Sequence, residues 1–167
     1  MASGPDTTTS PAAPETATLD DSELKTATVL VVDDNQQNLE LLQAYLEDIG
    51  CGIESATDGV EAMKIIEQSP PDLILLDVMM PRMSGFQVCQ KIKQDPRLRE
   101  IPVVMVTALN EVSDVERAVE CGADDFLTKP VQRIELVTRV KSLLRVRMLK
   151  HKLEAALEKM KKLTGEG

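Results

Sequence analysis

The chain is 167 residues long, which suits one domain with extensions and is too short for two ordinary domains. Only 2% of its residues are aromatic, so the core must consist of Leu, Ile, Val and Met, and base stacking on aromatic rings is an implausible activity. The net charge is −9, and residues 28–145 hold 20 acidic against 12 basic residues, which argues against direct nucleic-acid binding by this region.

Residues 1–27 begin with MASGPDTTTSPAAPETAT, a stretch rich in Thr, Ala, Pro and Ser without hydrophobic periodicity. Such a composition buries too little apolar surface to offset the entropy lost on ordering, so we predict a disordered tail over 1–27. The sequence contains no apolar run of the kind that targets or anchors a chain. We therefore expect a cytoplasmic protein without membrane insertion.

From Thr28 onward, short aliphatic runs alternate with helical patterns. Strands are predicted at 29–32 (VLVV), 52–56 (GIESA), 73–76 (LILL), 103–106 (VVMV) and 125–127 (DFL), each followed by a helix. Continuous aliphatic strands are typical of a parallel sheet covered on both faces, and these connections fit crossover helices. The sequence thus predicts an α/β doubly wound sandwich around a five-stranded parallel sheet, with the domain spanning 28–144.

The three cysteines, Cys51, Cys89 and Cys121, are an odd number without CxxC spacing, which favours a reducing compartment. Each lies in or beside an apolar pattern, so we interpret all three as small buried side chains in preference to a redox or metal role. His151 is the only histidine, and a histidine-based metal cluster or proton relay is hard to build from one residue.

Polar groups follow four of the five predicted strands: Asp33 and Asp34 after the first, then Asp77, Thr107 and Lys129. Taken singly, each has an ordinary explanation: Asp34 or Asn35 could cap the first helix, Asp77 could cap a turn, and Lys129 could be a solvated charge. Their conjunction is more specific, because ligand sites of open parallel sheets lie beyond the carboxyl ends of the strands.

If the first and third strands are neighbours, the carboxylates of Asp33, Asp34 and Asp77 converge and repel one another. A hard divalent cation with oxygen ligands is the usual means of neutralising such a cluster, and Mg²⁺ commonly bridges carboxylates and a phosphoryl oxygen. Lys129 and Thr107 would then supply a positive charge and a hydroxyl donor to the remaining phosphoryl oxygens.

The segments VLVVDDN, LILLDVMMPRMSG, VVMVTA and GADDFLTKP resemble, in order and spacing, the response-regulator receiver domains of bacterial two-component signalling. The resemblance covers about Thr28 to Leu144 and implies a flavodoxin-like sheet with strand order 2-1-3-4-5. It implies a phosphorylation-dependent signalling switch whose partner is a sensor histidine kinase or a phosphotransfer protein. Such a domain is not an enzyme with a separate substrate, because it catalyses only its own phosphorylation and dephosphorylation.

The same resemblance implies a role for individual residues. Asp77 matches the phosphoacceptor, which receives a phosphoryl group from a phosphohistidine of the partner. Asp33 and Asp34 match the acids that bind Mg²⁺ together with Asp77, and the backbone carbonyl of Met79 matches a further metal ligand.

Thr107 and Lys129 match the two residues that contact the phosphoryl group. Phe126 matches the aromatic residue that switches together with Thr107, and Lys129–Pro130 matches a peptide bond that is usually cis. These matches complete the set of site residues that the resemblance implies.

Met79 and Leu109 depart from the pattern of family members that lose the phosphoryl group quickly. These positions lie two residues after Asp77 and two after Thr107, where fast members tend to carry polar side chains that position the attacking water. Both residues are apolar here, so the resemblance implies slow dephosphorylation.

The final helical pattern continues for about 30 residues without Gly or Pro, or roughly 45 Å, which exceeds what the domain needs. Within residues 145–167, apolar residues recur at alternating spacings of three and four, as in a coiled coil: Val146, Leu149, Leu153, Ala156, Met160 and Leu163. We expect a homodimer through this helix, with a plain amphipathic surface helix as the alternative. The helix also resembles the connectors that join receivers to cyclase or phosphodiesterase output domains.

Two alternatives to a self-contained switch follow from the sequence. The chain could be the amino-terminal regulatory part of a larger regulator with an enzymatic output domain. A haloacid-dehalogenase-like phosphatase also uses a strand-end Asp with Mg²⁺, Thr and Lys, but it needs an acid two residues after the nucleophile, where this chain has Met79. A flavodoxin-like cofactor site is disfavoured, because Asp33 and Asp34 would repel a phosphate.

Overall fold

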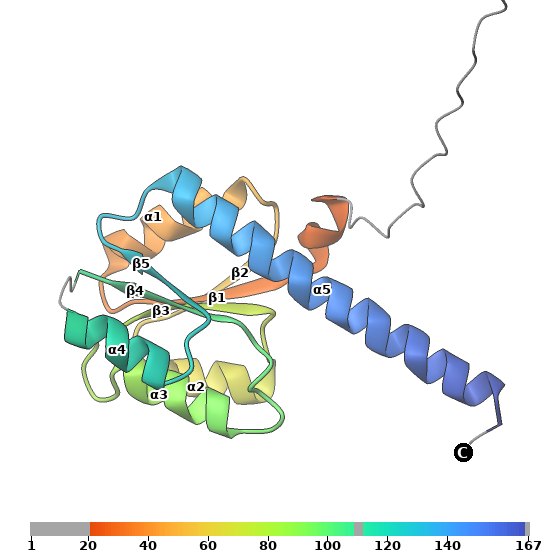
Figure 1. The fold of residues 1–167 in the computed structure, drawn as a ribbon. Helices are drawn as coiled ribbons and strands as arrows, with labels where there is room; N and C mark the ends of the chain where they lie inside the picture. Colours follow the sequence, from red (N-terminus) through yellow and green to blue (C-terminus); the bar gives the residue numbers. More distant parts are fainter. Residues whose placement is uncertain (1–20, 109–111, 166–167) are drawn as a thin grey trace, which may run out of the picture.

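The computed structural model describes residues 21–108 and 112–165 of the chain. A five-stranded parallel sheet has the order β2-β1-β3-β4-β5, so the predicted fold class and strand order are confirmed (Figure 1). In chain order the elements are the 3₁₀ helix η1 (Asp21–Thr26), β1 (Thr28–Val32), α1 (Gln36–Glu47), β2 (Gly52–Ala56), α2 (Gly59–Gln68), β3 (Leu73–Asp77), α3 (Gly85–Gln94), β4 (Val103–Thr107), α4 (Val112–Glu120), β5 (Asp125–Thr128) and α5 (Arg133–Leu163).

The sheet separates two apolar layers, with α1 and α5 on one face and α2, α3 and α4 on the other (Figure 1). In β1, for example, Val29 and Val31 pack in the first layer, and Leu30 and Val32 pack in the second. Successive residues of a strand point to opposite faces, so a strand covered on both sides needs apolar residues throughout. This explains why the central strands appear as unbroken aliphatic runs in the sequence.

Local caps fix where the helices begin beyond the carboxyl ends of the strands. The side chain of Asn35 caps α1 by accepting from the backbone N–H groups of Gln37 and Asn38. Ser84 caps α3 in a reciprocal capping box with Gln87. The backbone comes closest at Gly85, where an added Cβ would lie 2.2 Å from the carbonyl oxygen of Asp77, so only glycine fits beside the end of β3.

The long final helix is confirmed: α5 has 31 residues, or about 46 Å. Its first half covers the sheet through buried Leu136, Val140 and Leu144. Arg147 then anchors it to the domain, with its guanidinium 3.4 Å from an Asp72 carboxylate oxygen and 3.2 Å from the carbonyl oxygen of Glu100. Beyond this point the helix projects away from the sheet (Figure 1).

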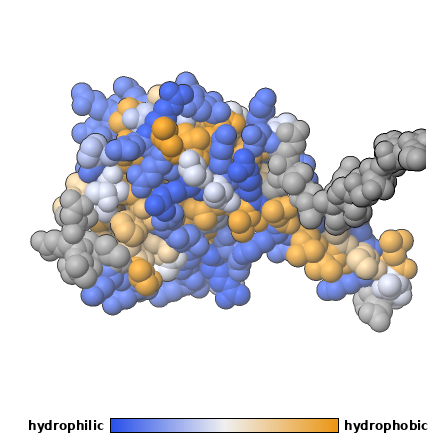
Figure 2. All heavy atoms as spheres, turned by 45° about the horizontal axis from the view of Figure 1, so that its top comes forward, coloured by the Kyte–Doolittle hydropathy of each residue, from blue (hydrophilic) through white to orange (hydrophobic). Residues whose placement is uncertain are grey.

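The projecting part of α5 carries exposed apolar side chains, which form part of the orange surface in Figure 2. Those with large side chains are Val146, Leu149, Leu153, Leu157, Met160 and Leu163. We call this set, together with Ala156, the α5 seam. It includes every position of the predicted coiled-coil pattern and adds Leu157.

The predicted tail of residues 1–27 is wrong at its carboxyl-terminal end, because residues 21–26 form η1. Leu24 of η1 is only 1% exposed and belongs to the core layer of α1 and α5. An ion pair of 2.8 Å between Asp21 and Arg145 also ties η1 to α5. A single leucine in a polar stretch gives no periodicity, so the sequence concealed this contact; residues 1–20 of the predicted tail lie outside the described residues.

Among the described residues, no helix combines the length and the apolar character needed to cross a membrane. This includes α5, whose exposed seam alternates with charged side chains.

Candidate functional site

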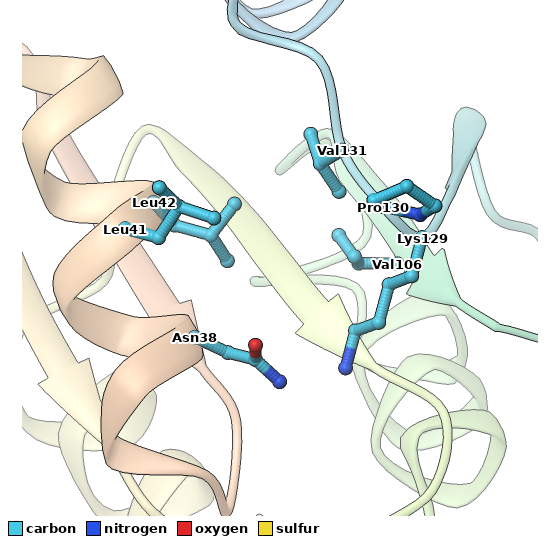
Figure 3. Close-up of a pocket in the computed structure, with 7 residues that line it drawn as sticks. All are labelled: Asn38, Leu41, Leu42, Val106, Lys129, Pro130 and Val131. Carbon is cyan, nitrogen blue, oxygen red and sulfur yellow. The ribbon is translucent and has the colours of Figure 1, made fainter.

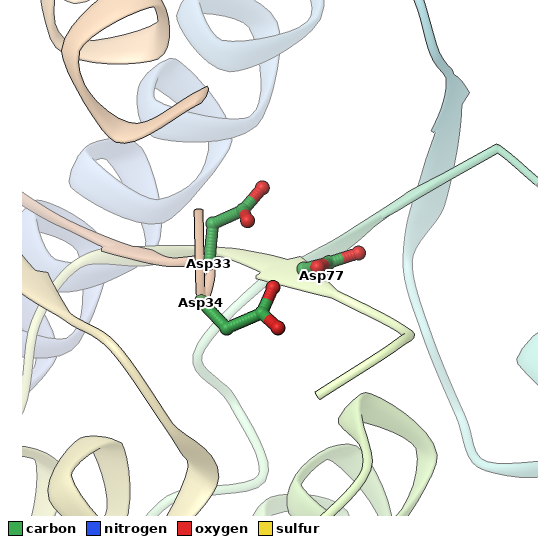
Figure 4. Close-up of side chains that lie close together, drawn as sticks. All are labelled: Asp33, Asp34 and Asp77. Carbon is green, nitrogen blue, oxygen red and sulfur yellow. The ribbon is translucent and has the colours of Figure 1, made fainter. Parts of the chain in front are cut away.

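Three carboxylates meet at the carboxyl edge of the sheet (Figure 4). Asp33 and Asp34 follow β1, Asp77 is the last residue of β3, and the two strands are hydrogen-bonded neighbours. One oxygen from each carboxylate lies within 4.8 Å of the others. The predicted convergence of these side chains is therefore present in the structure.

Asp33 is fully buried and serves as a fixed acceptor. Its Oδ1 accepts from the backbone N–H of Asn35 at 2.9 Å, and its Oδ2 accepts from Lys129 Nζ at 3.1 Å. Asp34, in contrast, is exposed at the mouth of the cluster. The two adjacent acids therefore differ, since one orients Lys129 inside the site and the other faces the solvent.

Asp77 is 4% exposed, and its Oδ1 lies 3.4 Å from Lys129 Nζ and 3.4 Å from the backbone N–H of Met79, which donates to it. Burial raises the pKa of Asp77 to about 6, and the charge of Asp33 acts in the same direction. The charge of Lys129 and the N–H of Met79 oppose this rise only in part. Asp77 is thus a carboxylate whose charge is incompletely compensated.

Lys129 extends from the end of β5 to both buried acids, 3.1 Å from Asp33 and 3.4 Å from Asp77. Burial lowers the pKa of Lys129, but its hydrogen bonds and attraction to Asp33 and Asp77 outweigh this, so the net direction is upward. The lysine is therefore a permanent cation at neutral pH. The bond to Pro130 is cis, as the sequence resemblance implied.

The remaining predicted residues surround this centre at different distances. Thr107 is buried at the end of β4, directly after Val106, the residue that pairs with Asp77 across β3 and β4. The backbone carbonyl of Thr107 accepts from the backbone N–H of Lys129 at 2.8 Å. Met79 is 63% exposed, and it contacts Asp77 through its backbone. Phe126 lies on β5 and is 38% exposed, while Leu109 lies outside the described residues.

A cavity of about 390 Å³ opens beside Lys129, between α1 and the segment that follows β5 (Figure 3). Its lining is largely apolar, with Asn38 and Lys129 as polar members: Asn38, Leu41, Leu42, Val106, Lys129, Pro130 and Val131. Asn38 and Leu41 were not among the predicted site residues. The only signal in the sequence was their position, because both lie within two helical turns of Asn35, shortly after Asp33.

The carboxylate cluster fits a hard divalent cation. All its side-chain ligands are oxygens, which Mg²⁺ prefers. One oxygen of each carboxylate lies within 4.8 Å of the others, so the three side chains face one common space that a cation would occupy. Lys129 balances one of the three negative charges, so the cluster still attracts further positive charge.

Known proteins are similar to this chain in sequence and fold. Residues 29–141 match the response regulator receiver domain family. The response regulator PleD of Caulobacter vibrioides is 47% identical over 123 residues, which cover 74% of this chain and 27% of PleD. The DNA-binding dual master transcriptional regulator RpaA of Synechocystis is 41% identical over 117 residues, which cover 70% of this chain and 48% of RpaA.

A solved structure gives the same result: the signal receiver domain of a signal transduction histidine kinase from Syntrophus aciditrophicus superposes with a TM-score of 0.68 and 42% identity. That comparison covers 71% of this chain and 90% of the other. The chain spans about a quarter of PleD and about half of RpaA, so the similarity to these relatives concerns one part of each.

Proposed function

Because this chain belongs to the response regulator receiver family, we propose that it is a signalling switch set by phosphorylation of Asp77. A sensor histidine kinase or a phosphotransfer protein would supply the phosphoryl group. The observation that carries this proposal is the position of Lys129 Nζ, within 3.1 Å of Asp33 and 3.4 Å of Asp77 in a cluster of three carboxylates. A phosphoryl acceptor needs both a nucleophilic oxygen and a nearby cation for the transferred charge.

In the proposed reaction an oxygen of Asp77 attacks the phosphorus of a phosphohistidine. The new P–O bond forms as the P–N bond breaks, and the imidazole remains with the partner. With a pKa of about 6, Asp77 is mostly ionised at neutral pH and can act as a nucleophile. Asp33 orients Lys129, which pairs with an oxygen of the transferred group.

Asp33, Asp34 and Asp77, with the backbone carbonyl of Met79, would hold Mg²⁺. When bound, the ion supplies positive charge to the phosphoryl oxygens. The chain's own contribution is the placement of its acids: buried Asp33 is fixed by two hydrogen bonds, whereas exposed Asp34 lies where ions and phosphoryl groups enter.

The cavity beside Lys129 offers a surface to the phosphoryl donor. Leu41 is 45% exposed on its rim, and Asn38 and Lys129 point into it (Figure 3). A partner helix that places apolar side chains against Leu41 would bring its phosphohistidine to the same edge of the sheet as Asp77. This arrangement supports a helical donor.

Switching would pass through Thr107 and Phe126. A phosphoryl group adds roughly −1.5 to −2 charges, which would draw the hydroxyl of Thr107 inward, and the ring of Phe126 would follow. The ring is 38% exposed, so the inward rotation would bury apolar surface. The face of α4 and β5 would change as a result.

The lifetime of the phosphoryl group and its readout are further parts of the proposal. Met79, 63% exposed beside Asp77, offers no polar atom of its side chain to position an attacking water, and we propose slow dephosphorylation. The α5 seam would pair with that of a second chain as a parallel coiled coil, or continue into an output domain of a larger regulator. Pairing with a second helix would bury the exposed leucines of the seam.

The test is phosphorylation by acetyl phosphate with and without Mg²⁺. The wild-type chain should acquire one acid-labile, hydroxylamine-sensitive phosphoryl group that depends on Mg²⁺, and Asp77→Asn should acquire none. Asp48→Asn is the matched control, since Asp48 is an exposed aspartate at the carboxyl end of α1, whereas the cluster lies near the amino end of that helix. Persistent labelling of Asp77→Asn at another aspartate would overturn the assignment.

A further inference from the structure

Two of the three cysteines meet between α3 and the residue that follows α4. The thiol of Cys89 lies 3.4 Å from the backbone carbonyl oxygen of Cys121 and hydrogen-bonds to it, although 32 residues separate the two in sequence. The thiol of Cys121 in turn donates to the backbone carbonyl oxygen of Ala118 at 3.1 Å, so the two thiols lie side by side, each held by a backbone carbonyl. Cys51 lies in the opposite core layer, across the sheet. The structure thus creates a thiol pair that the sequence spacing did not indicate.

The backbone around this pair is held from several directions. Lys93, one turn after Cys89, donates to the carbonyl oxygen of Ile101 and to the carboxylate of Asp124, both at 2.8 Å. Gly122 has a φ of +87° and turns the chain back toward α3, where an added Cβ would lie 3.0 Å from Lys93. Because both segments are anchored, the two sulfurs stay near each other without a large entropic cost.

The two cysteines of the pair differ in their exposure to solvent. Cys89 is fully buried, whereas Cys121 is partly exposed and lines a cavity of about 190 Å³. The other residues of the lining are Phe86, Gln87, Gln90, Arg117 and Glu120. A small oxidant that enters this cavity therefore meets Cys121, whereas Cys89 has no exposed surface.

The environment also distinguishes the two sulfurs chemically. The neighbouring thiol of Cys89 lowers the pKa of Cys121 to about 7, against the opposing effect of burial, and the N–H of Ala123 and the charge of Lys93 act in the same direction as Cys89. The neighbouring thiol of Cys121 and burial raise the pKa of Cys89. The exposed member thus becomes the thiolate, which is the reactive form of cysteine.

We propose that Cys89 and Cys121 are a reversible redox site that a peroxide converts into an intramolecular disulfide between α3 and the end of α4. The sulfur of Cys121 attacks a peroxide oxygen, the O–O bond breaks, and the products are a sulfenic acid and water. The sulfur of Cys89 then attacks that of Cys121, the S–S bond forms, the S–O bond breaks, and the proton of Cys89 leaves in a second water. Two thiols are oxidised, one peroxide is reduced, and an added dithiol reverses the reaction.

The disulfide would attach the end of α4 covalently to α3. This consequence rests on the proposed function, because it matters only if phosphorylation rearranges the face of α4 and β5. Cys121 directly follows α4, and Phe126 lies five residues further along the chain. A link at Cys121 therefore restrains the segment between α4 and the aromatic ring and opposes its movement.

The test uses the full chain, treated with hydrogen peroxide, alkylated, digested and mapped by mass spectrometry. We expect a peptide pair that joins Cys89 to Cys121, its loss after treatment with dithiothreitol, and continued alkylation of Cys51. Cys51→Ala, the matched control, should form the same link, and Cys121→Ser should leave Cys89 reduced. Cys89→Ser should accumulate sulfenic acid at Cys121, because the second thiol is missing. Cys89→Ala replaces this variant if it does not fold, with the same expected result.

Full alkylation of Cys89 and Cys121 after peroxide treatment would overturn the proposal, as would disulfides that form only between chains. Hydrogen exchange with acetyl phosphate then tests the consequence: the reduced chain should change its exchange over α4, and the linked chain should change less. Equal changes would refute the restraint. If the link forms but the reduced chain is not phosphorylated, the proposed function fails and the redox site stands.

Discussion

Replacing Asp77 with asparagine should stabilise the metal-free protein at neutral pH. Burial, with the charge of Asp33 second, raises the pKa of Asp77 from 3.8 to about 6 on folding. A raised pKa of an acid means that the folded state binds the proton more tightly than the unfolded chain does. The resulting stabilisation is fully present below the unfolded pKa and is lost as the pH rises through the folded pKa.

The magnitude follows from the size of this shift. A difference of about two pKa units corresponds to about 3 kcal/mol, which the wild type loses between roughly pH 3 and pH 7. Asp77 is 4% exposed, so solvent screening reduces this little. Asparagine carries no charge, and the free energy of unfolding of Asp77→Asn should exceed that of the wild type by about 2–3 kcal/mol at neutral pH. About half of this pH-dependent difference should be present at roughly pH 5.

The assay is urea denaturation in the presence of a chelator, followed by far-UV circular dichroism, because the chain has no Trp and only 1 Tyr for fluorescence. Glu67→Gln is the control, since Glu67 is an exposed carboxylate on α2. Its difference from the wild type should be small at every pH. Two results together would refute the assignment of this destabilisation to Asp77. Asp77→Asn would be no more stable than the wild type at neutral pH, and the difference in their free energies of unfolding would not change with pH.

Three further predictions concern the cluster, the lifetime and the α5 seam. Asp34→Ala should weaken Mg²⁺ binding in calorimetry, and an unchanged affinity would contradict its role as a ligand. It should also raise the melting temperature of the metal-free protein, but by less than Asp77→Asn does, because Asp34 is exposed. Met79→Asn should speed loss of the phosphoryl group from Asp77 several-fold in a quenched time course, and an unchanged rate would remove the role given to Met79. Leu153→Asp places a charge in the centre of the seam and should weaken self-association in ultracentrifugation by at least about tenfold, or about 1.4 kcal/mol. Phosphorylation should be unaffected. A wild-type chain that is already monomeric at high concentration would exclude the coiled coil.

The sequence by itself determined the elements and the residues that terminate them. Unbroken aliphatic runs such as LILL (73–76) predicted strands buried on both faces, and Asp58, a residue type that commonly caps helices, accepts from the N–H of Glu61 at the start of α2. Gly50 and Gly122 lie shortly after the ends of α1 and α4, and both have positive φ. These features depend on neighbours along the chain, since caps and periodicity act over a few residues, and they can therefore be predicted locally.

The identity of the polar residues at the strand ends was also visible in the sequence, because parallel strands place their carboxyl ends at one edge. Their convergence was conditional on the first and third strands being neighbours, and that order came from the resemblance to receivers. The pairing of β1 with β3 decides it, since this pairing brings Asp33 within reach of Asp77. Neither residue's local sequence specifies which strand lies beside its own.

Only the tertiary structure decided contacts between residues far apart in the chain. Leu24 was predicted to lie in a tail and is buried against the layer of α1 and α5, because the free energy of burying one leucine depends on a surface that distant residues build. Cys89 and Cys121 were interpreted as separate core residues, and they meet because Gly122 and Lys93 bring the end of α4 against α3. Composition and periodicity indicate whether a residue tends to be buried. Which residues it then contacts depends on the packing of whole helices and strands, which no local pattern contains.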